Sequence, residues 1–174
     1  LLHLWSLGIE EQFYIFWPIM LWFAYRRKWS MPLSIGLLAV ASFSLSIHLT
    51  GTHASSAFYL PLPRFWELLA GALLACSPQI TKISGSALVS NLFSAFGMAF
   101  ILAGFFLVSE MSAFPGWWAL LPVVGSALLI AAGPNGVFNK RLLSNRAMVW
   151  IGLISYPLYL WHWPILSFLR ILEG

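Results

Sequence analysis

The chain has 174 residues, of which 60% are hydrophobic and 8% charged, with mean hydropathy +0.86 and a net charge of +4. Because a soluble domain is usually about 25% charged, this composition excludes an ordinary water-soluble surface and indicates that the lipid bilayer is the main solvent. The basic residues form no dense patch, which argues against a nucleic-acid partner, and the single cysteine excludes an internal disulfide.

Six apolar segments follow one another along the chain and predict an all-α, polytopic membrane helix bundle. Five of them approach the length of about 20 residues that a helix needs to cross a bilayer. The third begins at Pro61 and Pro63 and stops at Pro78, so the sequence does not decide whether it crosses fully. The predicted helices are 7–25, 31–49, 63–77, 88–108, 117–133 and 147–169.

The charges support this division and predict an orientation. If the six segments alternate in direction, seven of the nine basic residues fall on one side and all five glutamates on the other. Since basic residues concentrate in cytoplasmic loops, we expect both ends of the chain to be extracytoplasmic. The seven basic residues are Arg26, Arg27, Lys28, Lys82, Lys140, Arg141 and Arg146.

The first polar motif lies in residues 3–18. Intervals of three and four residues place His3, Ser6, Glu10 and Tyr14 along one helical face, and Glu11 is adjacent. A carboxylate here would orient a histidine or bind a hydroxyl-bearing acceptor. It would equally serve the positive end of a helix dipole, and spacing alone leaves both interpretations open.

The second polar motif is PLPRFWELLAGALLA, residues 61–75. Arg64 and Glu67 are three residues apart, which predicts a local ion pair. The pair is either a structural clamp at the outer interface or a site where Arg64 contacts an anionic group or an acceptor glycan. Small residues predict close contact with another helix: Ala70, Gly71, Ala72 and Ala75.

The third polar motif lies in the last helix. Four small or polar residues share one stripe, which we expect to face the bundle interior, and Pro157 and Pro164 remove backbone hydrogen bonds. His162 is either an interhelical hydrogen-bonding residue or a proton carrier. No P-loop, GxGxxG, HExxH or CxxC motif occurs, so no metal site is predicted. The stripe consists of Gly152, Ser155, Tyr159 and His162.

Three blocks together carry a family resemblance: HLWSLGIEEQFYIFWP, RFWELLAGALLA and ISYPLYLWHWPIL. In this order and spacing they resemble the acyltransferase 3 family of integral membrane acyltransferases, which includes bacterial O-acetylases of lipopolysaccharide and peptidoglycan. The resemblance spans essentially the whole chain and implies a location in a bacterial inner membrane. It implies a bundle of about ten helices that transfers an acyl group, commonly acetyl, from cytoplasmic acetyl-CoA or another acyl-CoA to a hydroxyl of an extracytoplasmic cell-surface glycan.

The resemblance also predicts what surrounds residues 1–174. The principal histidine and arginine motifs of the family lie in its first helices, so we expect this chain to be the later part of the domain, to lack the donor site and to be inactive alone. The amino-acid sequences of the second and third blocks are similar to those of family members that continue into an SGNH-type domain. The expected partners are therefore acyl-CoA, the glycan and membrane lipid.

The resemblance assigns roles as expectations. Glu10 or Glu11 would orient the acceptor or a histidine, Arg64 and Glu67 would fix the mouth of the cavity, and Tyr159 and His162 would line its interior, with His3, Ser6 and Tyr14 as further substrate-binding residues. The main alternative is a non-catalytic transporter or flippase component for acyl groups or glycans, which kinked helices and polar stripes would also suit.

Overall fold

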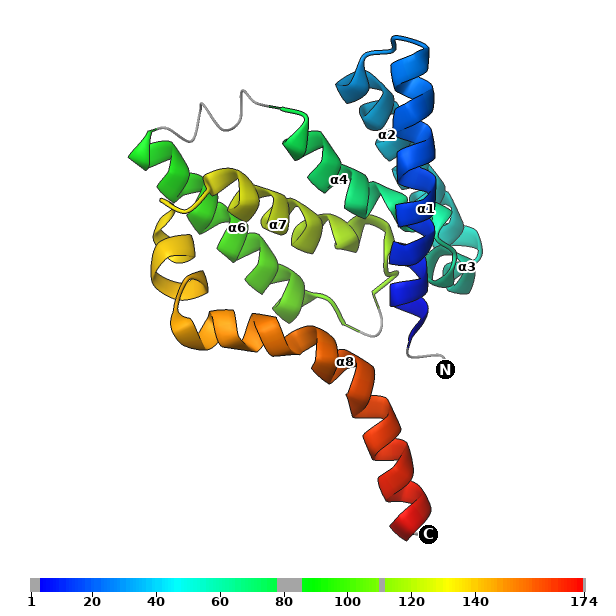
Figure 1. The fold of residues 1–174 in the computed structure, drawn as a ribbon, viewed down its shortest axis with the longest axis vertical. Helices are drawn as coiled ribbons and strands as arrows, with labels where there is room; N and C mark the ends of the chain where they lie inside the picture. The colour runs from blue at the N-terminus through cyan, green and yellow to red at the C-terminus, as the bar shows by residue number, and fades with distance from the viewer. Residues whose placement is uncertain (1–3, 78–85, 110–111, 174) are drawn as a thin grey trace.

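A computed structural model describes residues 4–77, 86–109 and 112–173, and every regular element in these ranges is a helix (Figure 1). The all-α prediction is therefore confirmed for the described residues. Two helices, α2 (Met31–Thr52) and α6 (Ala87–Leu107), are long and apolar enough to cross a membrane, and Gly116–Ala132 is a shorter apolar helix. The predicted count of six membrane spans is not confirmed.

The chain opens with two long helices, α1 (Trp5–Arg26) and α2 (Met31–Thr52). A Schellman motif ends α1: the N–H of Lys28 donates to the Tyr25 carbonyl at 3.0 Å, and the N–H of Trp29 donates to the Ala24 carbonyl at 2.9 Å. Lys28 takes the left-handed conformation of this motif, with φ 55°. Pro32 then lies in the first turn of α2, where its missing N–H costs no hydrogen bond.

The next segment folds back onto α2 through α3 (Ala54–Tyr59), η2 (Leu62–Arg64) and α4 (Phe65–Ala75). Ser42 of α2 ties it down, because its hydroxyl donates to the Leu62 carbonyl at 2.5 Å and accepts from the Trp66 N–H at 3.0 Å. That N–H belongs to the first turn of α4 and has no partner inside its own helix. Buried apolar side chains of α1, α2 and α4 form the core beside it: Ile9, Phe13, Ile35, Phe65 and Leu69.

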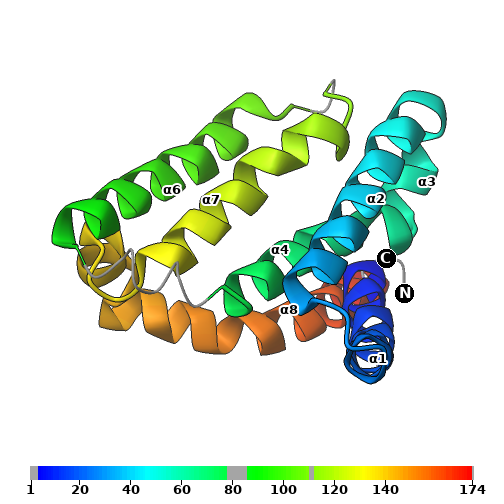
Figure 2. The ribbon, with the colours of Figure 1, turned by 90° about the horizontal axis from the view of Figure 1, so that it is seen from above.

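Helices α6 (Ala87–Leu107) and α7 (Leu120–Ala132) lie side by side, with η3 (Gly116–Ala119) leading into α7 (Figures 1 and 2). Their backbones meet at two glycines: a Cβ added to Gly97 would lie 2.8 Å from the Gly125 carbonyl oxygen. Ser90, fully buried on α6, donates to the Ala132 carbonyl. Glycine and serine therefore let these two helices approach closely.

The chain ends in a π-helical turn, η4 (Asn139–Leu143), and the long helix α8 (Arg146–Glu173), which points away from the other helices at its C-terminal end (Figure 1). The expectation that the whole α8 stripe faces the bundle interior is wrong for its first half. Gly152 and Ser155 are exposed, and the Ser155 hydroxyl bonds to the Gly152 carbonyl of its own helix. The reason is that no helix of the described chain packs closely over this part of α8.

Candidate functional site

Polar side chains from three separate helices gather where the first turns of α1 meet η2 and α4. We call Ser6, Glu10, Arg64 and Glu67 the polar cluster. Its members line one small cavity of about 80 Å³, together with Ile9 and Leu68. Sequence spacing placed these residues in two separate motifs, and the fold brings the two motifs together.

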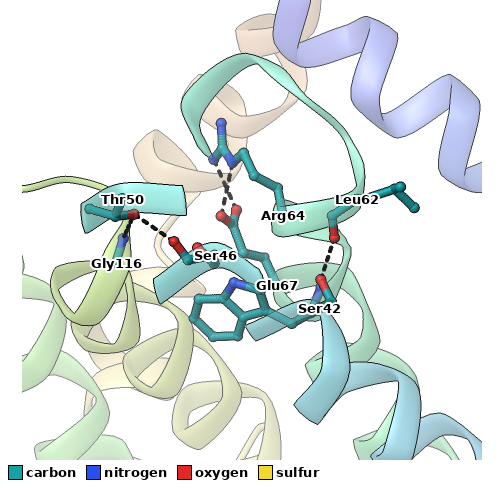
Figure 3. A network of polar contacts seen from close by, with 8 residues as sticks. Ser42, Ser46, Thr50, Leu62, Arg64, Glu67 and Gly116 are labelled. Carbon is teal, nitrogen blue, oxygen red and sulfur yellow. Dashed lines mark hydrogen bonds and ion pairs between the residues drawn. The ribbon is translucent and has the colours of Figure 1, made fainter. Parts of the chain in front are cut away.

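Arg64 and Glu67 of the polar cluster form an ion pair (Figure 3). Both contacts measure 2.9 Å, from Nε to Oε1 and from Nη2 to Oε2, so the predicted pair is present and bidentate. The two side chains are only 17% and 21% exposed. The guanidinium carbon also lies 5.0 Å from the Trp5 ring centroid and 5.8 Å from that of Phe58. Rings and carboxylate together fix the orientation of the arginine.

The ion pair borders two cavities, one on each side. Towards α1 lies the small cavity of the polar cluster, and towards α7 lies a second one of about 380 Å³, whose wall includes Ala70, Gly71 and Ser126. The prediction that Ala70 and Gly71 allow close helix contact is therefore wrong, because they border open space. A Cβ added to Gly71 would meet no atom within 4 Å.

A hydrogen bond joins helix α8 to the polar cluster. The hydroxyls of Ser6 and Tyr159 are 2.7 Å apart, although the residues are far apart in sequence. The ring of His162 lies 5.9 Å from that of Tyr159, and its Nδ1 is 2.7 Å from the Tyr159 carbonyl oxygen. Since a carbonyl only accepts, this contact places a proton on Nδ1.

Two other predicted residues lie apart from the polar cluster. Glu11 is exposed, Tyr14 is 63% exposed, and neither lines either cavity. Eight residues at 3.6 per turn rotate Tyr14 about 80° away from Ser6, so the shared face predicted from spacing holds for one turn only. His3 lies outside the described residues.

Sequence reasoning missed the groups that support the cluster. Trp5 and Phe58, which contact Arg64, come from different helices, and no local pattern joins them. Ser42, Ser46 and Thr50 recur every four residues in an apolar helix, and this signal was available in the sequence. Thr50 accepts a hydrogen bond from the Gly116 N–H at 3.2 Å and so connects α2 to η3 (Figure 3).

The chemistry available is that of oxygen and nitrogen side chains. Within the described residues, no three His, Cys or acidic side chains lie close enough to hold a metal ion. A carboxylate and a fixed arginine on one cavity suit the binding of a hydroxyl group, because the carboxylate accepts its proton while the guanidinium donates to an adjacent oxygen.

Comparison with known proteins shows that the chain is similar to O-acetyltransferases. The O-acetyltransferase OatA of Staphylococcus aureus is 33% identical over 97% of this chain and 30% of its own length. The peptidoglycan O-acetyltransferase OatA of Listeria monocytogenes is 31% identical over 95% and 28%, and YrhL of Bacillus subtilis is 31% identical over 94% and 28%. The chain thus spans less than a third of the length of these relatives. No solved structure matches it.

A family described as an acyltransferase domain matches residues 1–172 of this chain, which is almost its full length. All three sequence blocks fall inside this match, and the residues of the polar cluster are contained in the first two. The chain belongs to the acyltransferase 3 family.

Proposed function

We propose that this chain forms the acceptor side of a membrane O-acyltransferase that moves an acetyl group from acetyl-CoA to a hydroxyl of peptidoglycan or a related cell-surface glycan. The observation that carries the proposal is the cavity on which Glu10 and the Arg64–Glu67 pair converge. The acceptor class comes from the relatives' names, and the family supplies the reaction type.

The reaction needs a hydroxyl oxygen to attack the thioester carbonyl. A carbon–oxygen bond forms, the carbon–sulfur bond breaks, the hydroxyl proton passes to a base, and the thiol of CoA leaves. In the proposed arrangement Glu10 accepts a hydrogen bond from the acceptor hydroxyl and so orients its oxygen. Arg64, held by Glu67 and by the Trp5 ring, donates to a neighbouring glycan oxygen.

The structure supports Glu10 over Glu11 in this role, and the two adjacent glutamates provide a matched test. Glu10→Gln and Glu11→Gln are each introduced into the intact protein in its host. Base-released acetate from isolated peptidoglycan is then measured against the amount of membrane protein. We expect Glu10→Gln to lower acetate per molecule by about 100-fold, within the range for a proton-handling group. Glu11→Gln should lower it by less than about twofold, because Glu11, although as exposed as Glu10, lines neither cavity. Equal effects of the two substitutions would contradict the proposal.

His162 has the second role in the proposal, as the basic group beside Tyr159. His162→Ala should lower turnover more than it lowers the amount of protein, because imidazole is suited to proton transfer near neutral pH. Equal loss of turnover and protein would instead indicate that His162 serves packing.

One observation favours a second candidate, a transporter or flippase component. The Arg64–Glu67 pair separates two cavities, and such a barrier suits a path through the protein. Membrane vesicles supplied with radiolabelled acetyl-CoA distinguish the candidates. An acyltransferase forms a labelled ester on the glycan, whereas a transporter of acyl groups moves label across the membrane without forming one.

A further inference from the structure

A large apolar groove lies between α1 and α2, at the opposite end of α1 from the polar cluster. It has a volume of about 670 Å³ and is bordered by the second half of α1 and the first half of α2. Large apolar side chains on its walls stay exposed, among them Trp22 at 57% and Leu37 at 64%. We call this the α1–α2 groove, and its principal walls are Phe16, Met20, Trp22, Phe23, Leu33 and Leu37. An open apolar surface of this size marks a contact with membrane lipid or with another protein, or a ligand-binding groove.

Three cations stand at the end of the groove. The guanidinium carbon of Arg26 lies 5.3 Å from the centroid of the Trp22 ring, and that of Arg27 lies 5.2 Å from that of Phe23. Both rings are walls of the groove. Stacking uses the flat face of a guanidinium and leaves its N–H edge for an anion. Within the described part of the chain, neither arginine nor Lys28 has an ion pair.

The backbone at Lys28 adds an independent observation. Lys28 occupies the left-handed position of the Schellman motif, with φ 55°, a position that favours glycine because a Cβ is unfavourable there. A lysine here retains a positive charge beside the groove against the preference of the backbone.

We propose that the α1–α2 groove binds an anionic phospholipid, with an acyl chain along its apolar walls and the phosphate against Arg26, Arg27 and Lys28. A soluble phosphate would leave the apolar walls exposed, and an uncharged lipid would leave the three cations without a counter-charge. Helix α2 is apolar enough to cross a membrane, which places one wall of the groove at bilayer depth. Basic pockets between membrane helices are known to hold anionic headgroups. The charge distribution predicts that this leaflet is the cytoplasmic one.

The test uses the full-length protein, delipidated in detergent and studied by native mass spectrometry with phosphatidylglycerol or phosphatidylcholine of identical chains. We expect the wild type to retain phosphatidylglycerol at least tenfold more strongly. The variant Arg26→Gln/Arg27→Gln/Lys28→Gly should lose this preference, because each basic residue near a membrane surface contributes about fivefold. The melting temperature of this variant should not fall below that of the wild type, since glycine suits the left-handed position.

A matched control removes equal charge elsewhere. Lys140, Arg141 and Arg146 are all exposed near the start of α8, and replacing all three with Gln should leave the lipid preference unchanged. A second variant, Leu37→Trp, fills the groove without changing its charge and should weaken the binding of both lipids.

Three results would overturn the proposal. The first is equal loss of preference in the two triple variants, which would reduce the effect to overall charge. The second is unchanged phosphatidylglycerol binding in Leu37→Trp. The third is displacement of the lipid by an equal concentration of coenzyme A, which would assign the groove to a nucleotide.

Discussion

Helices α6 and α7 pack in direct contact, whereas α4 borders one cavity towards α1 and another towards α7. Between α6 and α7 the backbones meet at Gly97 and Gly125. Around α4 the contacts are between aromatic rings, such as Phe13 and Phe65 at 5.4 Å, and between charged groups. A membrane protein needs both kinds of contact, because close backbone packing supplies stability and spaced polar contacts leave room for a substrate. We infer that the α6–α7 interface is the structural half, and that α1–α4 together with the face of α7 that borders the second cavity form the functional half.

The largest effect should come from adding the same side chain to a glycine in each half. Gly97→Leu drives its side chain into the Gly125 carbonyl and the Leu129 backbone, neither of which can move aside, and should lower the free energy of unfolding by about 3 kcal/mol. Gly71→Leu enters the second cavity and should cost less than about 1 kcal/mol while blocking acetylation. Thermal unfolding in detergent and acetate release measure the two effects, and equal destabilisation would erase the distinction.

Asn139 tests whether the structural half is separate from activity. Its amide donates to the carbonyls of Leu129 and Gly133 at 2.7 and 2.8 Å, and its Oδ1 accepts from Ser94 at 3.1 Å. Asn139→Ala removes these three hydrogen bonds and should cost about 2 kcal/mol, with unchanged acetylation per folded molecule. Asn91→Ala, at an exposed position of α6, is the control and should change stability by less than about 0.5 kcal/mol. A fall in activity per molecule would link the halves.

The Arg64–Glu67 pair tests the functional half. Arg64→Gln or Glu67→Gln alone leaves a partly buried charge without its partner and should cost about 1.5 kcal/mol, less than for a fully buried pair because about a fifth of each side chain is exposed. The double variant removes both charges and should recover most of that stability. Acetate release should be at least tenfold below that of the wild type in all three variants. Recovery of activity in the double variant would show that the pair only clamps the fold.

The comparison also separates what the sequence could predict from what it could not. Apolar length and flanking charges predicted most helices closely: 88–108 against Ala87–Leu107, and 31–49 against Met31–Thr52. The short helix Ala54–Tyr59 was missed because six residues are too few to show a helical period. The Arg64–Glu67 pair was predicted because it is local.

Contacts between distant residues could not be predicted in this way. Spacing along a helix determines which side chains share a face, but not which neighbour covers it. The stripe on α8 shows this, since Ser155 is exposed while Tyr159, one turn later, contacts Ser6. The contact between the Trp5 ring and the Arg64 guanidinium likewise depends on how α1 meets η2, which no local pattern specifies.

The smallest predicted effect concerns that contact between α8 and α1. Tyr159→Phe removes only the hydroxyl that lies 2.7 Å from Ser6, and it should cost about 1 kcal/mol and lower acetylation a few-fold. Tyr156→Phe, at a position that is 57% exposed, should have no effect. Ser6→Ala in a double-mutant cycle with Tyr159→Phe should show coupling in both stability and activity. Additive effects in the cycle would mean that α8 is not held at the polar cluster by this bond, and that the functional half ends at α4.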